Sequence, residues 1–332
     1  MRNLTRSEIV PPTLKTAAEK SYAISSDHWT NPDVRGTLLA MQGHSCVYCQ
    51  SDMEQRMRPG TVDHFRPTSR YQWLAYRIEN MFLSCADCNS RVKNSDFPID
   101  QGGVRAKSDD DLADELRLLL DPVTDSIDQR LGIDYLDQRY SFQNLVTDQD
   151  SIDFRRVVTA IEVLRFAPGA DLTYRKKRVG VLSKLAEKID RHQRGSLSLA
   201  DQAELRRDVC RWKPFGEMSQ KLIRFHLPAP EASKLCPSSG QEYLWLIEDL
   251  ASAFDEVPTT DDAKRQQEEI RWCLAALLNS PPEDVDDTVI RRKLTDLDML
   301  PDIEELADQF ESNTQQPRSR SETLSTGHRG RF

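Results

Sequence analysis

Four cysteines stand in two pairs that have metal-ligand spacing. Cys46 and Cys49 form one CxxC pair, and Cys85 and Cys88 form the second. Two residues between paired cysteines let both thiolates turn onto one cation, and two such pairs give the tetrahedral sulfur set that suits Zn²⁺. A single CxxC could be a redox pair, but two of them in one stretch favour a metal. The sequence therefore predicts a structural zinc site at these four residues.

A polar pair lies between the two cysteine pairs. Residues 62–65 read Val-Asp-His-Phe, an order that suits a short hairpin with its apolar ends buried, and Asn89 follows on a predicted helix. Two strands and a helix braced by zinc would face Asp63 and His64 toward Asn89. Asp and Asn offer hard oxygens for Mg²⁺ or Mn²⁺, and a neutral imidazole can take a proton from water near pH 7. Hydrolysis of a phosphodiester needs both a bound metal ion and a group that takes a proton from water.

This set of residues resembles the HNH, or ββα-metal, nucleases. The run YQWLAYRIENMFLSCADCNSRVKNSDFP at 71–98 is similar to the HNH subunit of the Septu anti-phage system, the PtuB family. The similarity extends through residues 118–122 and, more weakly, to the Arg-rich segment near residue 175. It implies a nuclease that works beside an ATPase partner.

The resemblance also implies roles at single positions. His64 matches the general base, Asp63 a metal ligand, and Asn80 the middle Asn that ties down the loop. Asn89 stands where many of these enzymes have a second metal-ligating His, so this chain is an H-N-N variant. Because Asn is the weaker ligand, the preferred metal stays open. Asn89 has a second interpretation as a helix cap, which is compatible with ligation.

Three basic side chains are predicted to contact the nucleic acid. Arg91 and Lys93 lie on the predicted helix that carries Asn89, and Arg66 follows the DH pair. The alternative is a solvated helix charge for Arg91 and Lys93, and a packing or salt-bridge role for Arg66. The whole chain has a net charge of −9, but residues 41–95 contain seven Lys and Arg against five Asp and Glu. The site can therefore attract a polyanion.

The elements that position this site are predicted to be mostly helical. The fold class we expect is mainly α with a small zinc-stapled ββα unit, α+β overall. The expected regions are an N-terminal arm at 1–25, an HNH nuclease domain with structural zinc at 26–125, a helical partner-binding or regulatory region at 126–311, and a disordered tail at 312–332.

Apolar periodicity gives the individual helices. They are predicted at 14–22, 27–42, 151–168, 171–194, 199–212, 217–226, 241–254, 261–279 and 283–300, and residues 135–145 alternate weakly as strand or loop. The helix at 171–194 has a basic outer face that includes Arg178, Lys188 and Arg191. A solvated face is the simplest interpretation, with nucleic acid or an acidic partner as the alternative.

The composition of the chain limits the cell compartment and the class of function that we expect. No apolar run approaches a membrane span, the N-terminus shows no secretory signal, and the three remaining cysteines are expected to be reduced thiols. We expect a cytoplasmic, metal-dependent endonuclease that cleaves DNA, acting as the nuclease effector of an anti-phage defence system. The alternatives are an RNase, for example one that cleaves tRNA, with the same site, and a non-catalytic zinc module that recruits a partner.

Overall fold

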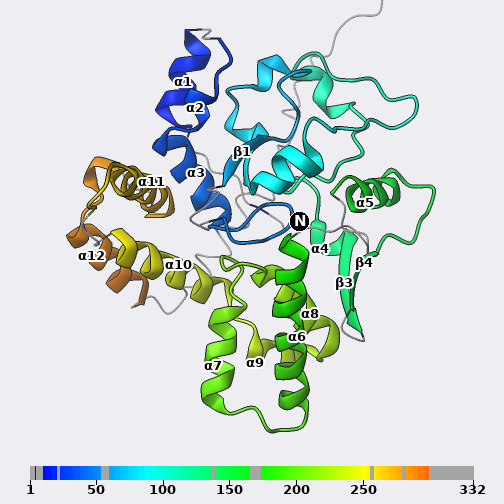
Figure 1. Cartoon of the computed structure of the whole chain (residues 1–332), viewed down its shortest axis with the longest axis vertical. Coiled ribbons are helices and arrows are strands. Elements are labelled where there is room, and N and C mark those ends of the chain that lie inside the picture. The colour runs from blue at the N-terminus through cyan, green and yellow to red at the C-terminus, as the bar shows by residue number, and fades with distance from the viewer. Residues whose placement is uncertain are drawn as a thin grey trace, which may run out of the picture.

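The chain is mainly helical, with two small antiparallel sheets in the part that the structure describes (Figure 1). The computed structural model describes residues 4, 10–20, 23–53, 60–136, 139–164, 173–254, 258–278 and 282–298. Mainly α with a small ββα unit is the fold class that was expected, and it is confirmed. Within these ranges, no helix has both the length and the apolar character needed to span a membrane. The tail predicted at 312–332 lies outside the described residues.

The ββα unit consists of two short strands and one helix. Its elements are β1 (Thr61–His64), β2 (Met81–Ser84) and the π-helix η3 (Asp87–Lys93). The strands are antiparallel, with His64 opposite Met81. Val62 and Phe65 are buried, as predicted for the ends of the polar pair. The strands are joined by a long loop, residues 65–80, instead of a tight turn.

Among the described residues, three helices precede this unit, and the last of them reaches its core. They are α1 (Pro12–Glu19), α2 (Ser26–Trp29) and α3 (Pro32–Gln42). The helix predicted at 27–42 is split between α2 and α3 at Asn31, whose ψ of 149° is extended. A residue before proline disfavours the α conformation, whereas Pro32 itself suits the first position of a helix. The chain therefore turns just before α3.

The main core joins the ββα unit to the C-terminal helices. These are α10 (Ser239–Phe254), α11 (Asp261–Leu278) and α12 (Asp287–Asp298), and Figure 1 shows them on the same side as α3. Apolar side chains of β1, β2, α3, α10 and α11 form one cluster. A Cβ added at Gly36 of α3 would lie 2.4 Å from the backbone oxygen of Glu269, so only glycine permits this contact. The Arg35 guanidinium donates to the Glu269 carboxylate at 2.8 Å across the same contact.

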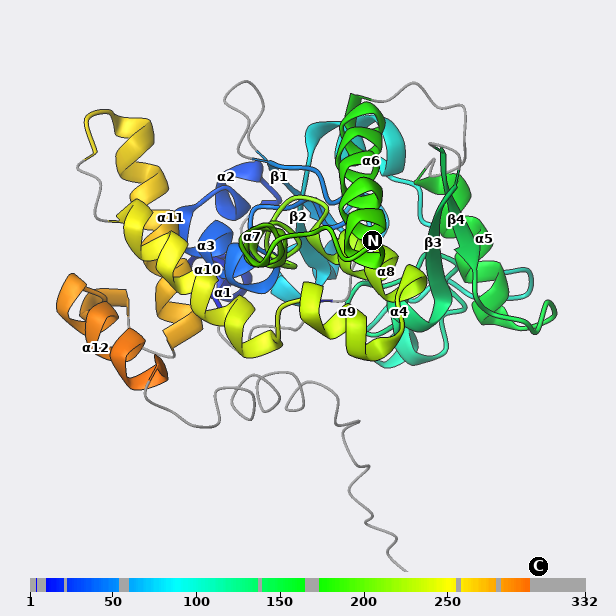
Figure 2. The same cartoon turned by 90° about the horizontal axis from the view of Figure 1, so that it is seen from below.

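A second core lies among four helices at one end of the molecule (Figures 1 and 2). They are α6 (Thr173–Gln193), α7 (Leu199–Asp208), α8 (Gly216–His226) and α9 (Ala229–Leu235). Leu182, Leu185 and Ile189 of α6 are buried in this core. The short helix α9 was not predicted, because Pro228 and Pro230 interrupt the apolar periodicity.

The basic side chains of α6 do not all face solvent. Arg178, expected on the outer face, is fully buried, and its guanidinium lies 5.2 Å from the centre of the Phe142 ring. Lys188 and Arg191 do lie on the outer face, where both form ion pairs with carboxylates of α7. This part of the face therefore pairs with carboxylates of the same chain.

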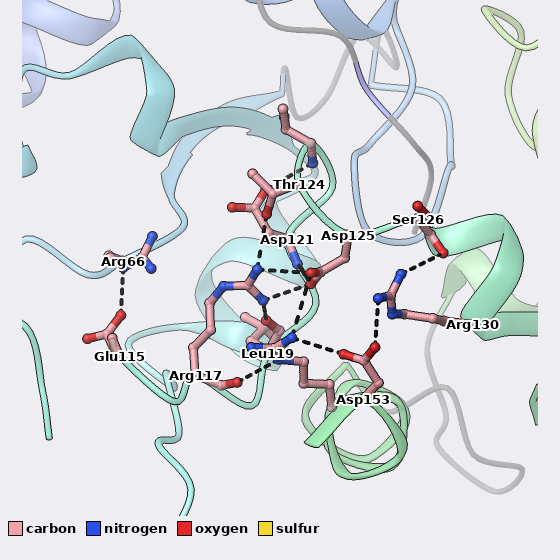
Figure 3. Close-up of polar contacts among 12 residues, drawn as sticks. Arg66, Glu115, Arg117, Leu119, Asp121, Thr124, Asp125, Ser126, Arg130 and Asp153 are labelled. Atoms are coloured by element: carbon pink, nitrogen blue, oxygen red, sulfur yellow. Dashed lines mark hydrogen bonds and ion pairs between the residues drawn. The ribbon is translucent and has the colours of Figure 1, made fainter. Parts of the chain in front are cut away.

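A second hairpin contributes Leu131 to the main core and Ile133 to the second core, and a cluster of ion pairs precedes it in the chain. The elements are α4 (Ile127–Arg130), β3 (Leu131–Leu136), β4 (Arg139–Asn144) and α5 (Ile152–Val163), and short 3₁₀ helices lie at Gln72–Leu74, Ile78–Asn80, Asp110–Ala113 and Pro282–Asp284. Figure 3 shows Arg117 bonded to both carboxylate oxygens of Asp125, at 2.7 and 3.0 Å. Arg156 of α5 donates to the Arg117 backbone oxygen at 3.0 Å. These contacts fasten α5 to the segment that follows the ββα unit.

Candidate functional site

The four paired cysteines converge on one point. Their sulfur atoms all lie within 4.8 Å of one another, and those of Cys49 and Cys85 are 3.7 Å apart. Tetrahedral zinc with Zn–S bonds of about 2.3 Å requires a sulfur separation of about 3.8 Å. The backbone N–H of Cys88 also points at the Cys85 sulfur, at 3.5 Å. The set fits a tetrahedral metal ion that takes sulfur ligands.

The first cysteine loop, residues 46–50, is fixed to the strands of the ββα unit. The backbone N–H of Val47 donates to the Leu83 oxygen of β2 at 3.2 Å. Gln50 takes a positive φ of 59° and its N–H donates to the Cys46 oxygen at 2.9 Å, which closes the loop. Tyr48, between the two cysteines, is fully buried. The loop that carries two of the sulfur atoms thus also places an aromatic hydroxyl inside the core.

The helices of the second core hold the opposite side of the first cysteine loop. Arg178 of α6 donates to the Cys49 backbone oxygen at 3.1 Å. The N–H of Phe215, just before α8, donates to the Gln50 backbone oxygen at 2.8 Å, and the N–H of Met218 donates to the Gln50 side-chain oxygen at 3.1 Å. The cysteine loop therefore lies between the ββα unit and the helical region and bonds to both.

His64 ends β1 and is half-buried. Its Nε2 lies 3.0 Å from the Ala75 backbone oxygen. A carbonyl oxygen only accepts, so Nε2 carries the hydrogen and Nδ1 keeps its lone pair. The Trp29 ring packs edge-on against the imidazole at 4.8 Å between ring centres. Burial lowers the pKa of His64 below its ordinary value of 6.5, against the opposing effects of the Ala75 bond and of Asp63. The imidazole is therefore neutral at neutral pH.

Asn80 joins the two ends of the long loop between the strands. Its Oδ1 accepts from the Arg66 N–H at 2.8 Å, and its Nδ2 donates to the Arg66 backbone oxygen at 2.9 Å. The Asn80 backbone oxygen accepts from the N–H of Phe65 at 2.8 Å. These bonds hold the chain immediately after His64 against the start of β2.

Asp63 is buried and bonded to two donors. The Tyr48 hydroxyl donates to Oδ2 at 2.5 Å. The Lys93 ammonium lies 3.2 Å from Oδ1 and 3.1 Å from Oδ2, and it also donates to the His64 backbone oxygen at 2.9 Å. Lys93 has no exposed surface. Neither expectation for Lys93, a phosphate contact or a solvated helix charge, holds in this conformation, because the ammonium is the buried partner of Asp63.

Asn89 lies on η3 against the start of β1. Its Nδ2 donates to Thr61 Oγ1 at 2.9 Å and to the Val62 backbone oxygen at 3.2 Å. Its Oδ1 takes no part in these bonds. The helix begins at Asp87 with Ala86 at the N-cap position, so Asn89 is inside the helix and is not its cap.

Comparison with known proteins identifies this stretch. Residues 46–95 match the family model described as HNH endonuclease, and they contain the cysteine cluster, both strands and η3. Residues 46–95 form an HNH endonuclease domain. The resemblance to HNH nucleases is therefore confirmed.

The chain is also similar to curated proteins named Septu protein PtuB. It is 28% identical over 130 residues to one from Bacillus mycoides (strain KBAB4), covering 35% of this chain and 44% of that protein. It is 31% identical over 68 residues to one from Bacillus thuringiensis, covering 20% of this chain and 26% of that protein. The chain thus spans less than half the length of the curated relatives it matches.

An HNH domain implies a divalent metal, and the residues expected to bind it do not fit one in this conformation. Both Asp63 oxygens lie beside the Lys93 ammonium, and one of them also accepts from Tyr48. Asn89 could offer its Oδ1, but a single amide oxygen makes a weak site. The structure brings Asp63 and Asn89 to the same seam between β1 and η3, where a lysine occupies the cation position.

The two arginines predicted to contact nucleic acid differ in exposure. The Arg66 side chain is 12% exposed and donates to Glu115 at 2.8 Å (Figure 3). Its guanidinium also lies over the Phe97 ring. The salt bridge is therefore its role here, and the expected phosphate contact is not available. The Arg91 side chain is 69% exposed and contacts Asp87 at 3.3 Å. Arg91 faces solvent on the HNH domain, and its phosphate contact stays a prediction.

Two functional features of the HNH domain were missed from the sequence. In the CxxC motif Tyr48 counts only as a spacer between cysteines, although the hydroxyl of a buried tyrosine usually pairs with a hydrogen-bond partner. The pairing of Lys93 with Asp63 had no local signal, because the two residues are 30 positions apart.

Proposed function

We propose that the chain is an endonuclease that hydrolyses phosphodiester bonds of DNA. The HNH domain at residues 46–95 supports an enzyme of the hydrolase class. The observation that carries the proposal within the site is the 3.0 Å contact between His64 Nε2 and the Ala75 oxygen. It leaves Nδ1 as the acceptor on a neutral imidazole, which is the form that a general base requires.

In the proposed reaction, His64 removes a proton from water and the resulting hydroxide attacks phosphorus in line. The bond from phosphorus to the 3′ oxygen breaks and that oxygen takes up a proton from solvent, so the products carry 5′-phosphate and 3′-hydroxyl ends. Asn80 acts as a positioning residue, because its bonds to the Arg66 backbone hold the chain beyond His64 in register. Arg91 is the proposed phosphate contact, since its charge is exposed beside the site.

Two kinds of metal belong to this proposal. Zn²⁺ is the proposed ion of the cysteine cluster, supported by the four sulfur atoms within 4.8 Å of one another. Mg²⁺ or Mn²⁺ is the proposed catalytic ion, with Asp63 and Asn89 as its protein ligands. Such an ion at Asp63 requires that the Lys93 ammonium first leave the carboxylate.

The wider role we assign is that of nuclease effector in a cytoplasmic anti-phage defence system. The similarity to proteins named Septu protein PtuB supports this role, as well as an ATPase partner resembling PtuA. The helical region at 126–311 is the proposed partner-binding and regulatory part. Its bonds to the first cysteine loop offer a physical route by which a bound partner would act on the HNH domain.

A cleavage assay on the full chain tests the proposal. Plasmid, linear DNA and tRNA are incubated with Mg²⁺ or Mn²⁺, with and without a purified PtuA-like ATPase. The variant is His64→Ala, and the matched control is His226→Ala, an exposed histidine at the end of α8. We expect DNA to be cleaved by the wild type and by the control and not by His64→Ala.

Other outcomes would select the alternatives. Cleavage of tRNA alone would make the chain an RNase with the same site. Equal cleavage by His64→Ala and wild type, or no cleavage of any substrate with the ATPase present, would favour a zinc module that recruits a partner.

A further inference from the structure

Lys93 has a set of contacts that would suit a bound cation. Its side chain has no exposed surface. The ammonium lies 3.2 and 3.1 Å from the two oxygens of Asp63, and it donates to the backbone oxygens of His64 at 2.9 Å and Asn94 at 3.5 Å. An ammonium has only donors. Every polar neighbour in this set is an oxygen acceptor, as in the oxygen-ligand sets that hard metal ions prefer.

The π-helix brings this ammonium to the catalytic strand. In η3, Asn89 bonds to the start of β1 and Lys93 bonds to its end, so the helix is bonded to both ends of the strand. The N–H of Asn94 donates to the Asn89 oxygen at 2.8 Å across five residues, which is the wide turn of a π-helix. Turns of this kind are rare and recur at functional sites.

The cation position at Asp63 is thereby occupied. A carboxylate offers about four acceptor positions. The Tyr48 hydroxyl uses one of them, and the Lys93 ammonium faces both oxygens. A divalent ion added here would lie next to the ammonium in a buried region that screens charge weakly. The two cations therefore exclude each other.

We propose that Lys93 is the resident counter-ion of Asp63 and that a divalent metal binds the HNH domain there only by displacing it. The inference rests on the proposed nuclease site, but it concerns metal binding and makes no use of the cleavage step. Lys93 then determines the metal concentration at which the site becomes occupied. In the conformation described here, the lysine prevents the metal from binding.

Binding of Mn²⁺ to the full, zinc-loaded chain tests the competition. Isothermal titration calorimetry compares the wild type with Lys93→Met, which keeps the long apolar stem and removes the charge. Lys107→Met, at an exposed lysine of the chain, is the matched control. We expect Lys93→Met to lower the Kd for Mn²⁺ at least about tenfold, which is about 1.4 kcal/mol, and Lys107→Met to leave it unchanged. Equal or weaker binding by a folded Lys93→Met would overturn the proposal.

A second measurement uses the wild type alone and does not depend on how the variant folds. Acetylation of lysines by an amine-reactive ester is followed by mass spectrometry without Mg²⁺ and with saturating Mg²⁺. We expect Lys93 to be protected without the ion and to react several-fold faster with it, while Lys107 reacts equally in both. Mg²⁺ binding with Lys93 still protected, or no binding of either ion to wild type and Lys93→Met, would overturn the displacement.

The two proposals fail separately. A chain that binds Mn²⁺ as expected but cleaves nothing contradicts the nuclease function alone. A chain that cleaves DNA with Mg²⁺ while Lys93 stays protected contradicts the displacement alone.

Discussion

Removing the Tyr48 hydroxyl tests how strongly the first cysteine loop holds the Asp63 carboxylate. Tyr48→Phe deletes one oxygen and keeps the ring, so the packing of the core around it is preserved. The hydroxyl donates to Asp63 at 2.5 Å. Tyr48 is fully buried and Asp63 is 3% exposed, so water cannot replace the lost donor.

The expected magnitude follows from the charge and the burial. Hydrogen bonds to charged groups contribute about 1.5–3 kcal/mol to stability, and a buried acceptor that loses its donor keeps its desolvation cost. Lys93 still faces the carboxylate, so the charge is not left without a partner. We therefore expect Tyr48→Phe to lower the free energy of unfolding by about 2 kcal/mol.

Urea denaturation followed by circular dichroism measures this loss. Tyr76→Phe is the matched control, because its hydroxyl donates to the Ala23 oxygen at an exposed site and should contribute less than about 0.5 kcal/mol. Metal analysis of Tyr48→Phe should show full zinc, since the four thiolates are unchanged. If the two variants are equally stable, the bond between Tyr48 and Asp63 does not hold the site and the reasoning is refuted.

Three further predictions concern the cysteine cluster, the base and the main core. Cys85→Ser should release the metal and destabilise the HNH domain, because a closed thiolate site contributes folding free energy directly; metal analysis and circular dichroism check this. His64→Ala should lower the cleavage rate about 10²–10⁴-fold. Burial lowers the pKa of His64, and only the neutral imidazole accepts a proton. As the pH is lowered, the cleavage rate of the wild type should therefore fall only below the ordinary histidine pKa of 6.5, and a pH–rate profile measures this. Gly36→Ala should lower stability by about 1–3 kcal/mol, since the new Cβ would lie 2.4 Å from the Glu269 oxygen; thermal denaturation measures it.

Each of these has a contradicting result. Full metal content and unchanged stability in Cys85→Ser would remove the cluster as a folding element. An acid limb of the rate profile well above pH 6.5 would assign the base to another group. Wild-type stability in Gly36→Ala would mean that α3 and α11 separate at no cost.

Local spacing made the cysteine cluster predictable, because two CxxC pairs indicate it directly, whereas the catalytic roles of His64 and Asn80 stay predictions. The predictions for Lys93 and Arg66 failed for a common reason. Charged side chains are almost always exposed unless they are paired, and here the partners lie 30 residues away at Asp63 and 49 residues away at Glu115. A sequence pattern gives the chance of exposure and not the identity of a distant partner.

The positions of the helices could be predicted from the sequence, but the contacts between them could not. Apolar periodicity gave α5, α6, α8, α10 and α11 to within a few residues, because each buries one face. The contact of Arg35 with Glu269 joins residues 234 positions apart, and no local pattern encodes it. Arg178 was assigned to the wrong face because its partners, Cys49 and Phe142, come from other parts of the chain.

The contact between α3 and α11 has a consequence for the order of synthesis. The ribosome makes residues 46–95 well before it makes Ile270 and Leu274, which belong to the same core as β1 and β2. Until α11 has emerged, α3 lacks the helix that covers it, so the HNH domain cannot complete its core while the chain is still short. A nascent chain of this protein therefore lacks the α11 side of its main core until Ile270 and Leu274 have been made.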